Sequence, residues 1–286
     1  MARIGIIGGT GLYEMLGVEG SQEVHMTTPF GSPSDVLFLG RVCGKEIVFL
    51  PRHGRYHSLL PTEVNYRANI AALKMSGVSK IISISAVGSL KEDIRPGQMV
   101  VIDQFFDRTN RRKDNTFFGD GLVGHIQFGD PVCPSMRDII IMAAEKHTKD
   151  FRPNGTYVNM EGPAFSTRAE SLFYKSLGFD VIGMTNLVEA KLSREAEMCY
   201  ATIAMVTDYD CWREGEESVT VEVILEILKK NTEFGRKLVR SIIEILDADS
   251  DCPCHSNLRY ALVTPFDKVP EETKAKLSFI IEKYLK

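Results

Sequence analysis

The amino-acid sequence predicts an α/β fold built around a central β-sheet. Short apolar runs alternate with helical patterns through most of the 286 residues, and this alternation is typical of the class. Hydrophobic residues make up 44 % of the chain and charged residues 25 %, an ordinary mixture for a protein that buries a sizeable core. No repeat, low-complexity tract or Pro/Gly/Ser-rich linker interrupts the pattern. We therefore expect residues 1–286 to form a single domain, with 247–286 as an extension.

Eight short apolar stretches are expected to be extended. Segments 36–42 and 46–50 bracket a Cys-Gly-Lys turn and fit a hairpin better than two helical turns. The other expected strands are 3–7, 80–85, 99–103, 157–160, 181–184 and 202–206.

Helical spacing of apolar residues predicts five helices. The first follows Pro61 and stops at Gly77, a common helix terminator, and another opens at the capping box Thr167-x-x-Glu170. The expected helices are 62–76, 135–149, the segment after Thr167, 189–198 and 221–246.

Two further segments lack a strong pattern. Residues 108–129 are rich in Arg, Asn, Asp and Gly, which makes them the best candidate for a mobile loop. A polar break at 247–257 follows the long helix, and the tail 259–286 is expected to add a strand and a helix.

Charge and cysteine usage exclude several classes of protein. A net charge of -4 and a pI near 5.9 give no general attraction to nucleic acid or anionic lipid. The N-terminal residues lack the features of a secretory signal, and no apolar run is long enough to span a bilayer. Six cysteines in a chain of this length do not form a disulfide framework, so we expect a cytoplasmic protein with mostly buried thiols.

Cys252 and Cys254 stand apart, because they lie in a polar segment next to His255. A strained redox-active bridge, a metal site or coincidence would each account for them. One Cys-x-Cys pair with a single His supplies fewer ligands than a closed zinc site needs, so we expect no metal site.

Four strand ends carry groups suited to an anion, and ligands of open α/β sheets collect at such ends. Glycines around Thr10 let backbone N–H groups approach a negative charge. The guanidinium group of Arg52 can donate two parallel hydrogen bonds to phosphate oxygens, and His53 is its neighbour in the sequence. Ser85 and Thr185 close two other strands with hydroxyls. Each feature alone also fits a plain turn, and the glycine pattern is neither a full G-x-G-x-x-G nor a P-loop.

Asp208 and Asp210 directly follow a buried apolar run. Two carboxylates at the end of a buried strand are costly unless they are paired, hydrated or used. Paired Asp residues often cap a turn. Beside an anion cluster they become candidates for protonating a heterocyclic leaving group.

Seven sequence blocks occur together in one order: Ile6-Ile7-Gly8-Gly9-Thr10-Gly11-Leu12, Thr28-Pro29-Phe30-Gly31, Arg52-His53-Gly54-Arg55-x-His57, Asn65-Tyr66-x-Ala68-Asn69, Val87-Gly88-Ser89-Leu90, Glu161-Gly162-Pro163-x-Phe165-Ser166-x-Arg168-Ala169-Glu170 and Thr207-Asp208-Tyr209-Asp210-Cys211-Trp212. From residue 4 to about residue 245 they resemble the 5'-methylthioadenosine phosphorylases of the purine nucleoside phosphorylase family. Ser85 departs from the Thr of many relatives but keeps the hydroxyl, and Val87 stands where some have Cys.

The resemblance implies a central mixed sheet with a small barrel, flanked by helices, and a homo-oligomer that is a trimer or a dimer of trimers. It implies phosphorolysis of 5'-methylthioadenosine to adenine and 5-methylthioribose 1-phosphate, a step of purine and methionine salvage. Inorganic phosphate is a co-substrate, and no metal or organic cofactor is expected. The Cys-x-Cys tail resembles the hexameric archaeal branch, whereas Cys211-Trp212 is closer to the trimeric animal branch.

The resemblance also implies roles for individual residues. Asp208 and Asp210 would be catalytic, contacting the purine 6-amino group and N7. The phosphate ligands would be Thr10, Arg52, His53, Ser85, Ala86 and Thr185. The nucleoside would contact Phe165 and Ser166 at the base, Met184 at the ribose, and His125, Val219, Val221 and Ile224 at the methylthio group, with His125 lent by a neighbouring subunit.

Three alternatives differ in chemistry. A broad-specificity purine nucleoside phosphorylase would act on adenosine, inosine or methylthioinosine, but Asp208 and the apolar residues 219, 221 and 224 disfavour it. A hydrolytic nucleosidase would need no phosphate. A nucleotide-binding module would cleave no nucleoside, and the incomplete glycine fingerprint counts against it.

Overall fold

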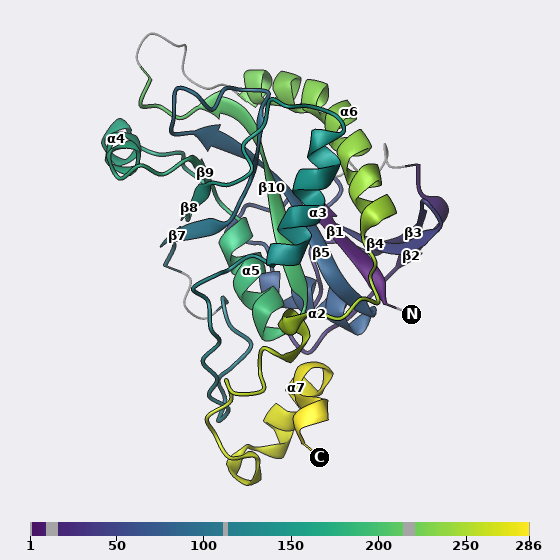
Figure 1. Cartoon of the computed structure of the whole chain (residues 1–286). Helices are drawn as coiled ribbons and strands as arrows, with labels where there is room; N and C mark the ends of the chain where they lie inside the picture. Colours follow the sequence, from purple (N-terminus) through teal and green to yellow (C-terminus); the bar gives the residue numbers. More distant parts are fainter. Residues whose placement is uncertain (1, 10–16, 111–113, 214–220, 286) are drawn as a thin grey trace.

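A ten-stranded mixed sheet with helices on both faces forms the centre of the molecule (Figure 1). The computed structural model describes residues 2–9, 17–110, 114–213 and 221–285, and the backbone alone for 221–232. The strand order is β2-β3-β4-β1-β5-β9-β8-β7, and β10 pairs with both β5 and β6. This architecture confirms the predicted α/β class.

The strands are β1 (Arg3–Gly8), β2 (Glu19–Val24), β3 (Leu37–Val42), β4 (Lys45–Pro51), β5 (Val78–Ser89), β6 (Met99–Val101), β7 (Gln104–Arg108), β8 (Thr156–Met160), β9 (Val181–Gly183) and β10 (Cys199–Tyr209). The helices are α2 (Tyr66–Met75), α3 (Pro134–Glu145), α4 (Arg168–Ser176), α5 (Asn186–Glu195), α6 (Val221–Ile245) and α7 (Glu271–Ile281). Short 3-10 turns, η1 (Pro253–Ser256), η2 (Phe266–Lys268) and η3 (Glu282–Tyr284), complete the tail.

Part of the sheet closes into the small barrel that the resemblance implied. β5 pairs with β10 and β9, β8 joins β9 to β7, and β6 pairs back onto β10. Because only Ile102 and Asp103 separate β6 from β7, this circuit of strands is continuous. Tyr157, Val181 and Val206 belong to the apolar cluster that these strands share.

Apolar side chains that point alternately to the two faces of the strands form a hydrophobic core on each face of the rest of the sheet. Ile4 and Ile6 of β1 pack in one cluster with α3 and α6, whereas Ile7 packs in another with α2 and α5. Successive strand residues point to opposite faces, so both faces of a continuously apolar strand are buried. Of the described helices, none is both long and apolar enough to cross a membrane.

Several predicted boundaries shift for local reasons. The β3–β4 hairpin is confirmed by its antiparallel register. The helix predicted at 62–76 begins only at Tyr66, because the Asn65 side chain caps it by accepting a hydrogen bond from the Ala68 N–H at 3.1 Å. The capping box at Thr167 and Glu170 forms as predicted. Helix α5 begins at Asn186, three residues before its predicted start.

The prediction of a mobile loop at 108–129 is wrong for its described residues, 108–110 and 114–129. β7 reaches Arg108, and Phe117 and Leu122 are buried. Glu195 of α5 fixes the segment by accepting hydrogen bonds from the Phe117 N–H at 2.6 Å and the Thr116 hydroxyl at 2.7 Å. The strand predicted in the tail is also wrong, since 259–285 contributes one isolated bridge, between Gly124 and Leu262, and otherwise turns and α7.

Burial of Glu195 makes stability depend on pH. Desolvation raises the pKa of its carboxyl to about 7 from 4.5, so between these values the folded chain holds a proton that the unfolded chain has released. This contribution is complete below pH 4.5 and is lost as pH rises through 7. In the wild type, this group should lower the free energy of unfolding by no more than about 3 kcal/mol over this pH range. Glu195→Gln should abolish that decrease, as measured by denaturant titration at several pH values. Glu145→Gln, at an exposed glutamate of α3, should keep the wild-type slope, and an equal slope in both variants would refute the assignment.

Candidate active site

The ends of β1, β4 and β5 meet at one edge of the sheet. Gly8 pairs with Pro51 and Ile7 pairs with Ser83, so the residues that follow these strands are neighbours. The Arg52 N–H donates to the Gly8 carbonyl at 3.1 Å, which joins two of the predicted anion-binding turns. Thr10 lies outside the described residues.

The Arg52 side chain lies in a buried ion pair that the sequence did not predict. Its Nε is 2.5 Å from Glu189 Oε1, and Nη2 donates to Glu189 Oε2 at 3.2 Å and to Ser83 Oγ at 2.7 Å. Nη1 donates to the Ile84 carbonyl at 2.9 Å. Four of the five guanidinium N–H groups therefore have partners, so Arg52 retains one N–H for an anion rather than the predicted bidentate fork.

Other buried polar side chains hold Glu189 in place. The Tyr200 hydroxyl donates to Glu189 Oε2 at 3.0 Å, and the Ser83 hydroxyl donates to the same oxygen at 2.7 Å. Asn186 donates to Ser83 Oγ at 2.8 Å. Because every charge and hydroxyl here is compensated, the network fixes the position of Arg52 beneath the anion turns.

His53 is neutral at physiological pH. Burial, with the positive charge of Arg52, lowers its pKa to about 4. Its Nδ1 lies 2.9 Å from the Leu59 carbonyl oxygen, which can only accept a hydrogen bond, so Nδ1 carries the proton and Nε2 is left as a hydrogen-bond acceptor. The ring stacks on His57 with centroids 4.5 Å apart. Such a histidine fits a protonated phosphate oxygen better than a bare anionic oxygen.

Hydroxyls on β5 and α5 are available at the same edge. Ser85 Oγ is buried with no hydrogen-bond partner of good geometry among the described residues, and Ala86 beside it is exposed. Thr185 is the N-cap of α5, yet its side chain makes no capping hydrogen bond. The N-terminus of a helix attracts negative charge, so the early start of α5 adds a favourable dipole that the sequence analysis missed.

The two aspartates flank Gly88 farther along β5. β10 pairs Asp208 with Gly88, and a Cβ at Gly88 would lie 3.1 Å from Asp208 Oδ1 and 3.4 Å from Asp210 Cβ. The Thr207 hydroxyl donates to Asp208 Oδ2 at 2.7 Å. Asp210 Oδ2 is buried without a partner of good geometry among the described residues, and burial raises the pKa of this carboxyl. The pair therefore combines a hydrogen-bond acceptor with a group that holds a proton more readily.

The anion turns and the acid pair lie at opposite ends of a short stretch of one strand. Ser85 and Gly88 are three residues apart on β5, which is about 10 Å at 3.3 Å per strand residue. Met184 follows β9 beside Thr185, and its Sδ would lie 2.6 Å from a Cβ at Gly162, so the thioether packs on that turn. A sugar between a phosphate and a heterocycle fits this length.

The sequence model of one family matches residues 3–244, which is most of the chain and includes every element described at this site. The chain belongs to the Phosphorylase superfamily. The tail beyond residue 244, with η1 and α7, lies outside the matched range.

Curated relatives within the superfamily match over almost the whole chain. The chain is 56 % identical over 283 residues to an S-methyl-5'-thioadenosine phosphorylase of Koribacter versatilis, covering 99 % of this chain and 97 % of that one. It is 53 % identical over 282 residues to the S-methyl-5'-thioadenosine phosphorylase of Geobacter sulfurreducens, covering 99 % of both.

Solved structures of superfamily members share the fold. A methylthioadenosine phosphorylase from an antarctic soil metagenomic library superposes with a TM-score of 0.92 at 45 % identity, over 98 % of both chains. A methylthioadenosine phosphorylase of Schistosoma mansoni in complex with adenine gives a TM-score of 0.82 at 36 % identity, over 99 % of this chain and 98 % of that one.

Not all residues predicted for this superfamily member are brought together. Phe165 is 59 % exposed, and the carbonyl of Ser166 accepts a hydrogen bond from Cys211 Sγ at 3.2 Å. His125 is exposed and lies with the tail, since its N–H donates to the Ala261 carbonyl at 2.8 Å. Val219 lies outside the described residues, and the side chains of Val221 and Ile224 are not described. Among the described residues predicted at the base, Ser166 is joined to Cys211, which follows Asp210, and Phe165 precedes Ser166.

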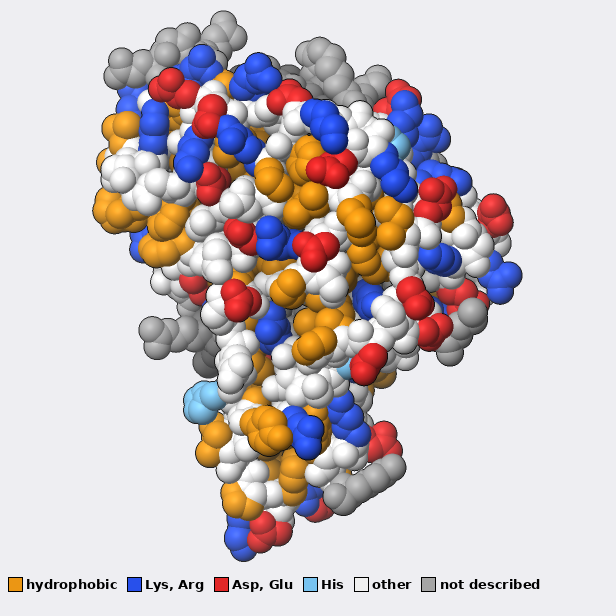
Figure 2. All heavy atoms as spheres, in the orientation of Figure 1, with side chains coloured by type: hydrophobic (Ala, Val, Ile, Leu, Met, Phe, Trp, Pro, Cys, Tyr) orange, Lys and Arg blue, Asp and Glu red, His pale blue; other side chains and the backbone are white. Residues whose placement is uncertain are grey.

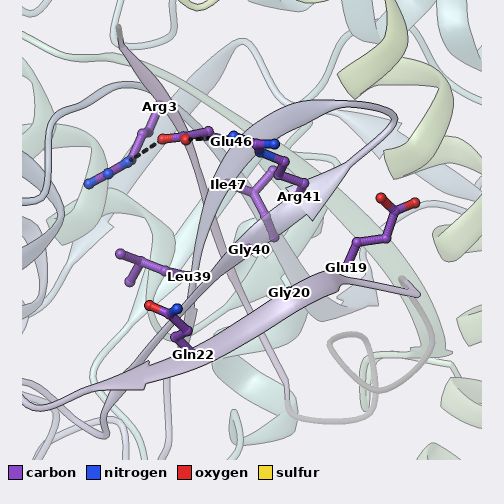
Figure 3. Close-up of a pocket in the computed structure, with 9 residues that line it drawn as sticks. All are labelled: Arg3, Glu19, Gly20, Gln22, Leu39, Gly40, Arg41, Glu46 and Ile47. Atoms are coloured by element: carbon purple, nitrogen blue, oxygen red, sulfur yellow. Dashed lines mark hydrogen bonds and ion pairs between the residues drawn. The ribbon is translucent and has the colours of Figure 1, made fainter.

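A cavity of about 410 Å³ lies elsewhere in the superfamily fold, over β2, β3 and β4. Figure 3 shows Arg3 and Arg41 approaching Glu46 across it. Arg3 Nε lies 2.9 Å and Arg41 Nη2 lies 3.5 Å from that carboxylate, so these charges compensate one another. None of the predicted site residues lines this cavity, and we assign it no ligand.

Proposed function

We propose that this chain catalyses the phosphorolysis of 5'-methylthioadenosine to adenine and 5-methylthioribose 1-phosphate. The observation that carries the proposal is the identity of 53 % and 56 % to S-methyl-5'-thioadenosine phosphorylases over 99 % of the chain. The strand ends support it, because they set hydroxyls, Arg52 and the α5 N-terminus opposite an acidic pair.

The reaction needs stabilisation at both ends of the breaking bond. A phosphate oxygen forms the new bond to C1' of the ribose while the bond from C1' to N9 breaks and its electron pair moves into the purine. Arg52, Ser85, Ala86 and Thr185 would hold the phosphate beneath the ribose. Asp208 and Asp210 would supply a proton toward N7 and accept a hydrogen bond from the 6-amino group.

The same acidic pair favours a 6-amino purine. A carboxylate accepts a hydrogen bond from the adenine amino group, whereas the oxygen of hypoxanthine is itself an acceptor and would repel it. We therefore expect methylthioadenosine and adenosine to be preferred over inosine. Comparable kcat/KM values for all three at saturating phosphate would favour the broad-specificity alternative.

Ser85→Ala tests the phosphate position with little disturbance of the fold. Its hydroxyl has no hydrogen-bond partner of good geometry among the described residues, and the buried Tyr157 hydroxyl is the group that interacts with it. Loss of one hydrogen bond to an anion should raise the phosphate KM about tenfold, with kcat nearly unchanged. Ser21→Ala, at an exposed serine of β2, is the control. A wild-type phosphate KM in Ser85→Ala would remove this residue from the site.

The working form is proposed to be a homo-oligomer, a trimer or a dimer of trimers. Large apolar side chains are exposed on and beside α4: Phe165, Leu172, Phe173 and Leu177. Figure 2 shows hydrophobic side chains gathered at the edge where Figure 1 places α4. His125 lies with the tail, so it would reach a nucleoside only in a neighbouring subunit. Native mass spectrometry separates the two oligomers, and a monomer at working concentration would contradict the proposal.

A further inference from the structure

Four of the six cysteines lie together away from the active site. The Sγ atoms of Cys133, Cys199, Cys252 and Cys254 all lie within 4.8 Å of one another. The Sγ atoms of Cys133 and Cys252 are 3.7 Å apart, and all four side chains are free thiols. Cys252, Cys254 and His255, which are neighbours in the sequence, are by themselves too few ligands for a closed site.

The cluster draws on three separate parts of the fold. Cys133 is the N-cap of α3, and Cys199 is the first residue of β10. Cys252 and Cys254 come from the tail, at η1. Only the tertiary structure brings these residues together, since up to 121 positions of sequence separate them.

We propose that these four cysteines bind one zinc ion per chain. Tetrahedral coordination with zinc–sulfur bonds of about 2.3 Å places the sulfur atoms about 3.8 Å apart, close to the 3.7 Å between Cys133 and Cys252. Four soft sulfur ligands select zinc or iron over hard cations such as magnesium and calcium. The thiols release their protons to solvent on binding, and no oxidant or reductant takes part.

Burial assigns the site a structural role. Cys133, Cys199 and Cys254 are 1 %, 0 % and 6 % exposed and Cys252 is half-buried, so the cluster lies mostly inside the fold. A site with four protein ligands and no open position is the structural type of zinc site. Metal there would fasten the tail, and with it α7 and the segment that carries His125, to α3 and β10.

Neighbouring donors fit a cluster of negative sulfur atoms. Ser135 Oγ lies 3.2 Å from Cys133 Sγ, and His255 Nε2 lies 3.6 Å from Cys199 Sγ. As the N-cap of α3, Cys133 also lies at the positive end of a helix dipole. Hydrogen bonds of this kind orient metal ligands and offset their charge.

Metal content of the full-length, untagged protein tests the proposal. After purification under reducing conditions from zinc-supplemented cells, elemental analysis should find about one zinc per chain. Cys252→Ser, at the half-buried ligand, should lower zinc content at least about tenfold, since one of four ligands is lost. Cys43→Ser is the matched control, because Cys43 is a partly exposed thiol outside the cluster. Equal zinc in wild type and Cys252→Ser, or none in wild type, would overturn the proposal.

Cobalt substitution and thiol counting do not depend on the folding of a variant. Wild-type protein stripped of metal and loaded with cobalt should gain the sulfur-to-cobalt charge-transfer absorption of a tetrahedral thiolate site. Titration of the denatured, unreduced protein with chelator present should find all six cysteines as thiols. Fewer thiols would show disulfides in place of metal, and stoichiometric iron would show the wrong metal. Either result would refute the zinc site.

Discussion

Asp208→Asn and Asp210→Asn are each expected to lower kcat/KM for 5'-methylthioadenosine by about 10²-fold or more, which is the usual contribution of a positioned acid or base. An asparagine keeps the size of either side chain but cannot donate a carboxylic proton, and its amide N–H groups would oppose the 6-amino group. The lost interaction acts in the step in which the purine leaves. The decrease should therefore appear mainly in kcat.

Steady-state kinetics at saturating phosphate measure this effect. Asp267→Asn, at an exposed residue of η2, is the control for a lost surface charge. Wild-type kcat in both site variants would remove the acidic pair from the chemistry. A loss confined to one of them would assign the proton to that residue.

Arg52→Ala is expected to lower the free energy of unfolding by about 3–5 kcal/mol, in addition to any effect on phosphate. The cause is Glu189, 1 % exposed, which would lose the guanidinium that lies 2.5 Å away. Breaking one side of a buried ion pair leaves an uncompensated charge, whereas removing both sides is often nearly neutral.

Chemical denaturation of Arg52→Ala and of the double variant Arg52→Met/Glu189→Leu measures this coupling. The double variant should recover only part of the stability that the single variant loses, because the buried Tyr200 and Ser83 hydroxyls lose the carboxylate to which they donate. Neither variant should bind phosphate as wild type does. Unchanged stability of Arg52→Ala would contradict a buried, paired arginine. A double variant as unstable as the single one would contradict the role of Glu189.

The alternation of apolar and helical patterns sufficed to predict the fold class and most of its elements. It failed where the signal was not local. β2, which reads Glu-Gly-Ser-Gln-Glu-Val, is mostly exposed and has no apolar alternation, so only its pairing with β3 makes it a strand. Residues 114–118 were predicted to be mobile because Glu195, which accepts hydrogen bonds from Thr116 and Phe117, is far away in the sequence.

At the site, the strand-end turns could be predicted from local residues, but the buried ion pair of Arg52 and Glu189 could not. A glutamate at the first residue of a predicted helix gives no sign that it pairs with Arg52, since they are 137 residues apart. The predicted helix start at 189 overlooked Thr185 and Asn186, although both are residue types that commonly cap a helix N-terminus. The sequence predicted ordinary buried thiols at Cys133 and Cys199. In the structure both lie beside the cysteines of the tail.

The most direct measurement is the dependence of 5'-methylthioadenosine cleavage on inorganic phosphate, with both products identified. The enzyme should release no adenine in phosphate-free buffer, and its rate should rise and saturate with phosphate while 5-methylthioribose 1-phosphate forms in equal amount. Equal rates without phosphate, with free 5-methylthioribose as the sugar product, would show that water is the nucleophile and that the strand-end hydroxyls and Arg52 do not hold phosphate.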